Sequence, residues 1–185
     1  MKTEYLLERQ VAHVLAALTP ENRLVARVCL HTGLRVGDVL SIRTDQLALQ
    51  FTVTESKTGK HRRVGLTQQL LDDVRAQAGE IWAFPGRAIK RRTEEAPRTR
   101  QAVWADIKRA SKAFRLPQNV GPHSLRKVYA VDLMNKYGDL KRVQRALQHS
   151  SPEITAIYAM ADRLLEVKLA QKRKKGRADK GARVL

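Results

Sequence analysis

Hydrophobic residues recur along most of the chain at the three- and four-residue intervals that are typical of amphipathic helices. The helices that this spacing predicts cover residues 4–18, 20–32, 36–42, 67–78 and 99–114. Gly33 follows the second of these segments and is expected to end it in the left-handed conformation that glycine adopts readily. The pattern therefore predicts a mainly α-helical fold.

One stretch alternates instead with the two-residue period of a β-strand. Residues 47–66, LALQFTVTESKTGKHRRVGL, alternate around Gly59, which predicts a β-hairpin with Lys57 close to its tip. The short apolar run IWAF at 81–84 is expected to add an edge strand. We therefore expect a small three-stranded antiparallel sheet within a helical domain, which is α+β in the broad sense.

The charge balance changes the picture, because 36 lysines and arginines stand against 18 acidic residues and leave a formal charge of +18. An excess of this size indicates a polyanionic partner, and nucleic acid is the leading candidate. An anionic membrane surface is the competing partner, but no apolar run approaches the roughly 20 residues that span a bilayer, and no signal peptide opens the chain. We expect a cytoplasmic, nucleoid-associated protein without membrane contact.

Cysteine and histidine usage excludes two further classes of protein. The single Cys29 lies in the apolar stretch LVARVCL, so we expect a buried structural thiol and no disulfide framework. The five histidines are scattered without metal-ligand spacing, so no metal site is expected.

Residues 121–160 hold the side chains with the clearest catalytic chemistry. His123 and Arg126 are three positions apart where a helix is expected to begin, so both side chains should lie on one face of its first turn. The N-terminus of a helix also favours a bound anion. His149 and Tyr158 are separated by Ser150-Ser151-Pro152, a signal for a helix break and a new N-terminus. A turn there can bring both residues to one cleft, and the stretch predicts a phosphoryl-transfer site.

Four motifs together resemble the tyrosine recombinase (phage integrase) family, in the family's order, from about Leu7 to Tyr158. They are TGLRVGDVL at 32–40, SKTGKHRRV at 56–64, HSLR at 123–126 and LQHSSPEITAIY at 147–158. The resemblance implies a site-specific DNA recombinase of the integrase or invertase type that acts on double-stranded DNA. It also implies that the reaction needs no metal, ATP or other cofactor.

The resemblance assigns roles to the catalytic residues. Tyr158 is expected to attack a DNA phosphodiester and form a 3′-phosphotyrosyl link. Arg35 and Arg126 match the family's arginine pair, and their planar donor forks suit the charge that develops on a phosphorane. Lys57 matches the hairpin lysine and is expected to protonate the leaving 5′ oxygen.

Two histidines and one aspartate complete the expected site. His123 and His149 match the family's histidine positions, where they are expected to donate hydrogen bonds to the phosphate and to manage the proton of Tyr158. Asp38 stands where the family usually has an acidic residue, and we expect it to orient Arg35 or His123 by hydrogen bonding.

The same resemblance implies the domain organisation. Residues 1–167 are expected to form the catalytic domain and residues 168–185 a basic, flexible tail, without the N-terminal core-binding domain that family members usually carry. The free protein is expected to be a monomer that assembles on DNA as a dimer or tetramer, as in recombinases of mobile elements.

Two other functions fit the same residues. A type IB topoisomerase would use the same chemistry to nick and reseal one strand, and would relax supercoils without a defined site. A DNA-binding regulator with a vestigial site would form no covalent adduct, and the complete set of six catalytic residues argues against it.

Overall fold

The computed structural model describes residues 3–87 and 95–147. The chain divides into two compact units, Met1–Tyr129 and Ala130–Leu185. Helix α6 (Pro122–Tyr137) begins in the first unit and continues into the second.

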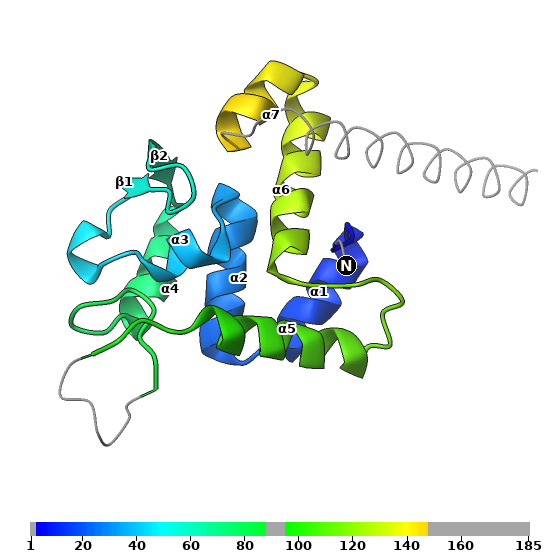
Figure 1. The fold of residues 1–185 in the computed structure, drawn as a ribbon, viewed down its shortest axis with the longest axis horizontal. Helices are drawn as coiled ribbons and strands as arrows, with labels where there is room; N and C mark the ends of the chain where they lie inside the picture. Colours follow the sequence, from blue (N-terminus) through cyan, green and yellow to red (C-terminus); the bar gives the residue numbers. More distant parts are fainter. Residues whose placement is uncertain (1–2, 88–94, 148–185) are drawn as a thin grey trace, which may run out of the picture. The chain divides into compact units, whose positions relative to one another are not determined.

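The first unit is built mainly of helices. They are α1 (Glu8–Ala17), α2 (Pro20–Thr32), α3 (Val36–Leu40), α4 (Gln68–Gln77), α5 (Arg100–Ala113), the start of α6, and the short 3-10 helix η1 (Thr44–Gln46). Helix α5 packs against α1 and α2 and crosses their lower ends in Figure 1. The structure confirms the predicted helical fold, although the first helix begins at Glu8 rather than at residue 4.

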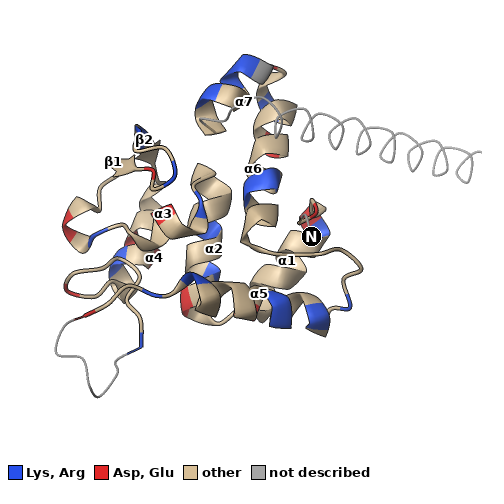
Figure 2. Cartoon of the chain, in the orientation of Figure 1, with Lys and Arg blue, Asp and Glu red and all other residues tan. Residues whose placement is uncertain are grey.

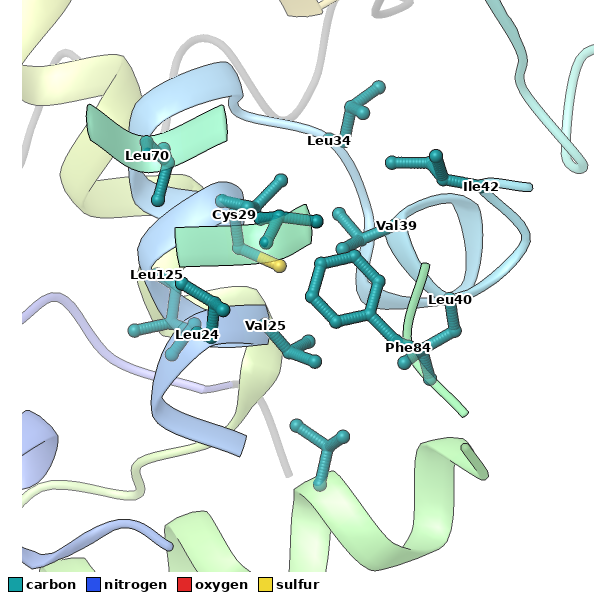
Figure 3. Packing of buried hydrophobic residues seen from close by; sticks show 14 of the residues in the cluster. Leu24, Val25, Cys29, Leu34, Val39, Leu40, Ile42, Leu70, Phe84 and Leu125 are labelled. Carbon is teal, nitrogen blue, oxygen red and sulfur yellow. The ribbon is translucent and has the colours of Figure 1, made fainter. Parts of the chain in front are cut away.

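One hydrophobic core fills the first unit. Val25 and Cys29 of α2 lie beside Val39 of α3 and Phe84, and Leu125 of α6 packs into the same cluster (Figure 3). Complete burial raises the pKa of the Cys29 thiol to about 12, so this thiol is protonated and packs as a small apolar side chain. The predicted structural role of Cys29 is confirmed.

The predicted hairpin is present as β1 (Gln50–Thr54) and β2 (His61–Gly65), which pair antiparallel with Val53 opposite Arg62. The third strand expected at 81–84 is wrong: in the described residues the sheet has two strands, and Trp82 makes only an isolated bridge with Arg43.

The third strand does not form because the Glu95 side chain accepts the backbone N–H groups that a strand would need. The backbone N–H groups of Glu80, Ile81 and Trp82 donate to the carboxylate of Glu95, with donor–acceptor distances of 2.8, 3.4 and 2.9 Å. These groups are therefore not available to a β ladder.

The second unit is described from Ala130 to Leu147. Gly138 ends α6 with a φ of 64°, and the carboxylate of Asp139 accepts the backbone N–H groups of Lys141 and Arg142 at the start of α7 (Leu140–Leu147). Among the described helices of both units, none is long and apolar enough to cross a membrane.

Candidate functional site

Arg35 is held on a rigid bend between two helices. Gly33 ends α2 with a φ of 66°, and its N–H donates to the carbonyl oxygen of Cys29 at 2.8 Å. Arg35 follows as the N-cap residue of α3, with its side chain 13% exposed. The bend that the sequence predicts is confirmed, and it aims a largely buried guanidinium from a fixed backbone.

The partner of Arg35 is a residue that the motifs did not indicate. Nη1 of Arg35 lies 2.6 Å from Oε2 of Glu55, a carboxylate with no exposed surface. Oε1 of Glu55 lies 3.6 Å from Nη1 of Arg62, and Nη2 of Arg62 donates to the carbonyl oxygen of Thr32. Glu55 and Arg62 continue the buried alternation of Phe51, Val53 and Val64, and a charge at such a position is the signal that could have revealed them.

Asp38 has a different main partner from the expected one. Its Oδ1 accepts from the backbone N–H of Ser56 at 2.9 Å and from the Ser56 hydroxyl at 2.7 Å. Its Oδ2 lies 3.9 Å from Nη1 of Arg35, which is an electrostatic contact and too long for a hydrogen bond. Asp38 therefore ties the hairpin turn to α3 and acts on Arg35 only through its charge.

Arg126 reaches the same bend from α6. Its Nη1 donates to the carbonyl oxygen of Gly33 at 2.5 Å, and its side chain is almost fully buried. A Cβ atom at Gly33 would lie 2.2 Å from the ring of Tyr129, so only glycine lets α6 approach this closely. The bend that carries Arg35 thus also fixes Arg126.

We call Arg35, Asp38, Glu55, Arg62 and Arg126 the arginine cluster. These five side chains are three guanidiniums and two carboxylates, and the guanidiniums repel one another. Burial, together with the charges of Arg35 and Arg62, lowers the pKa of Arg126 to about 10. An anion bound at the cluster would relieve this repulsion.

Basic residues are spread over several elements of the first unit. Lys and Arg lie on β2, α2 and α6 as well as on α5 (Figure 2). Within the described residues, no group of three or more histidines, cysteines and carboxylates could hold a metal ion.

The remaining expected site residues are placed only in part. Lys57 is exposed in the turn between β1 and β2, and His123 is exposed in the first turn of α6, one turn before Arg126. His149 and Tyr158 lie outside the described residues. The structure brings Arg35 and Arg126 to one bend and leaves the other predicted roles as predictions.

Comparison with known proteins identifies the family. The sequence profile of the phage integrase family matches residues 4–163. The chain belongs to the phage integrase family. Tyrosine recombinase XerD of Lacticaseibacillus casei is 32% identical over 147 residues, which cover 74% of this chain and 49% of that protein. The chain spans about half the length of the curated relatives it matches.

Solved structures of family members share the fold. The catalytic domain of bacteriophage HP1 integrase has a TM-score of 0.62 at 23% identity, over 86% of this chain and 89% of that domain. A lambda integrase tetramer bound to a Holliday junction has a TM-score of 0.65 at 22% identity, over 85% of this chain and 48% of that one. This member of the phage integrase family therefore has the fold of an integrase catalytic domain.

Proposed function

We propose that this chain is the catalytic part of a site-specific DNA recombinase that cleaves and rejoins DNA through a 3′-phosphotyrosyl intermediate. The observation that carries the proposal is the arginine cluster, which fixes the guanidiniums of Arg35 and Arg126 at one bend between α2 and α3. Membership of the phage integrase family supports the same reading.

In the proposed reaction, Arg35 and Arg126 bind the non-bridging oxygens of the phosphodiester. The phenol oxygen of Tyr158 forms a bond to phosphorus, and the bond from phosphorus to the 5′ oxygen breaks. Developing charge on the phosphorane strengthens its hydrogen bonds to both guanidiniums, which lowers the barrier.

Proton transfer falls to the remaining residues. Lys57 gives a proton to the departing 5′ oxygen, which is more basic than a phenolate. His123 and His149 donate hydrogen bonds to the phosphate, and one of the two accepts the proton that Tyr158 loses. Rejoining reverses these steps on a new 5′ hydroxyl.

The proposal extends to partners and domains. Residues 1–167 form the catalytic domain, and the basic tail 168–185 adds sequence-independent contacts to phosphates. A monomer assembles on double-stranded DNA into a dimer or tetramer, in keeping with the tetramer that lambda integrase forms on a Holliday junction. A protein that recombines chromosomal or phage DNA would act in the cytoplasm, at the nucleoid.

The test uses nicked duplexes whose sequence is randomised around the nick. After attack by Tyr158 the short 5′-hydroxyl fragment diffuses away, and the covalent adduct is trapped and seen as a slower band in a denaturing gel. Sequencing the trapped DNA then identifies the preferred site. The wild-type chain should form the adduct, and Tyr158→Phe should form none.

The matched control is Tyr137→Phe, which removes the hydroxyl of an exposed tyrosine at the end of α6 and should leave the adduct unchanged. Adduct formed equally by Tyr158→Phe would contradict the assigned nucleophile. Relaxation of supercoiled plasmid without sequence preference would favour a topoisomerase, and binding without any adduct would favour a regulator.

A further inference from the structure

Glu55 lies where the hairpin backbone turns. It directly follows β1, its N–H donates to the carbonyl oxygen of Lys60 at 2.9 Å, and its own carbonyl oxygen accepts from Thr58 and Gly59 at 3.2 and 2.8 Å. These bonds close the turn that carries Lys57. The backbone of Glu55 therefore sets where the Lys57 turn begins and ends.

The side chain of Glu55 points the other way, into the arginine cluster. Its carboxylate has no exposed surface, contacts Arg35 at 2.6 Å and lies 3.6 Å from Arg62. The turn is also fixed on its far side, because Asp38 accepts both hydrogen bonds from Ser56. One residue thus connects the Arg35 guanidinium to the backbone that presents Lys57.

Stability alone does not explain a carboxylate at this position. A buried ion pair must repay the desolvation of both charges, and an apolar pair of similar volume is often as stable or more so. Among the described residues, Oε1 of Glu55 and Nη1 of Arg62 have no hydrogen-bond partner. An unsatisfied buried charge in a native protein calls for an explanation, and a functional role is one such explanation.

We propose that Glu55 is a positioning residue that holds the Arg35 guanidinium and the Lys57 turn in fixed relation, so that both act on one phosphodiester. This inference rests on the proposed recombinase function and adds a residue to it. Loss of the Glu55 charge weakens the contact between the turn and Arg35, and the turn is then held mainly by the hydrogen bonds from Ser56 to Asp38. The proton donor is then misplaced, while the phosphate can still bind.

The test compares Glu55→Gln with wild type on two versions of the selected nicked duplex. One has the normal 5′-bridging oxygen and the other has sulfur, a leaving group that needs no proton. We expect cleavage of the oxygen substrate to fall by about 100-fold, as for a misplaced catalytic group. The loss on the sulfur substrate should be much smaller, and the dissociation constant for DNA should change little.

Two further variants complete the design. In a chain that already carries Lys57→Ala, Glu55→Gln should add little to the defect on the oxygen substrate. Asp73→Asn is the matched control, because Asp73 forms a 2.6 Å ion pair with Arg27 in the half-exposed surface of the same unit. It should leave the ratio of the two cleavage rates unchanged.

Equal losses on both substrates, or full additivity with Lys57→Ala, would overturn the role of Glu55 while leaving the recombinase proposal intact. If Glu55→Gln does not fold, Glu55→Asp keeps the charge and shortens the reach by one methylene, and the same oxygen-specific loss is expected. If wild type forms no adduct on any duplex, the recombinase proposal and the Glu55 proposal both fall.

Discussion

Two networks of carboxylates and arginines in the first unit differ in how completely their buried carboxylate oxygens are hydrogen-bonded. In the Asp106 network, Oδ2 of Asp106 accepts from the N–H of Thr19 at 3.0 Å and from Nδ2 of Asn22 at 2.8 Å. Oδ1 accepts from Nε and Nη2 of Arg109 at 2.9 and 2.6 Å. In the arginine cluster, Oδ2 of Asp38 and Oε1 of Glu55 have no hydrogen-bond partner among the described residues.

The pKa values of the two networks show the consequence. Burial raises the pKa of Asp106, but the hydrogen bonds from Asn22, Thr19 and Arg109 outweigh it, and the net pKa lies below its usual value. Burial and neighbouring cations instead lower the pKa of Arg126, so the surroundings of Arg126 disfavour its charged form. The Asp106 network stabilises the fold by itself, whereas the arginine cluster is electrostatically suited to an anionic ligand.

The largest contrast should appear in cleavage. Arg35→Lys keeps a positive charge but loses the planar donor fork, and we expect cleavage of the selected nicked duplex to fall by about 100-fold or more. Arg109→Lys makes the same exchange in the Asp106 network and should change the rate little. Near-normal cleavage by Arg35→Lys, measured as adduct formed per unit time, would remove Arg35 from the site.

The backbone of the arginine cluster should be less tolerant than a similar turn elsewhere. Gly33 and Gly59 share a φ of 66°, but a Cβ would meet the Tyr129 ring only at Gly33. Gly33→Ala should lower the free energy of unfolding by roughly 2–4 kcal/mol, from backbone strain and overpacking. Gly59→Ala should cost roughly 1–2 kcal/mol, from strain alone.

Chemical denaturation measures both changes. Tyr129→Ala removes the ring, so the added cost of Gly33→Ala should shrink toward that of Gly59→Ala in this background. An unchanged cost would show that the ring does not cause the difference.

Asp106→Asn should affect stability and leave chemistry alone. Loss of the charged acceptor is expected to cost about 1–3 kcal/mol of unfolding free energy, with normal cleavage by the folded protein. The pKa of Asp106 is lower in the folded protein than in the unfolded chain. Its charge therefore contributes to the free energy of unfolding above the unfolded pKa, and this contribution is lost as the pH falls through the folded pKa.

Thermal denaturation against pH checks this sign. The difference in Tm between wild type and Asp106→Asn should be constant near neutral pH and should narrow below about pH 4. A gap that widens in acid would contradict the assigned pKa direction.

The smallest effect concerns anion binding without DNA. Sulfate at ten times its dissociation constant should stabilise wild type by about 1.4 kcal/mol, and Arg126→Gln should lose this gain. Asp106→Asn should keep the gain, because Asp106 lies outside the arginine cluster. Sodium chloride at equal ionic strength controls for screening, and an equal rise in Tm with chloride would show that the cluster has no anion site.

Local signals in the sequence were enough for α1 to α5, the start of α6, the Gly33 helix end and the hairpin with Lys57 in its turn, whereas η1 and α7 were not predicted. These features depend on nearby residues, through periodicity and backbone preference. The third strand was predicted wrongly because its N–H groups bind Glu95, which lies 13 to 15 positions away in the chain. No local pattern reports such a contact.

The candidate site was predictable to a similar extent. Arg35 and Arg126 followed from the family motifs, and their common dependence on the Gly33 bend came from the structure. Glu55 was not predicted, because the family motifs indicate Lys57 at the hairpin tip, although the place of Glu55 on the apolar face after Val53 was a signal for it. The hydrogen bonds of Asp38 to Ser56 join positions 18 apart and needed three-dimensional coordinates.

The two buried charges of the hairpin, Glu55 after β1 and Arg62 within β2, have a consequence for protein engineering. A hairpin grafted from another member of the phage integrase family would replace Glu55 and Arg62, the two charges that hold the hairpin to α3 and to the end of α2. A transplanted hairpin with apolar residues at both positions would leave Arg35 without its 2.6 Å carboxylate contact. The exchangeable module is therefore the hairpin together with this pair of charges.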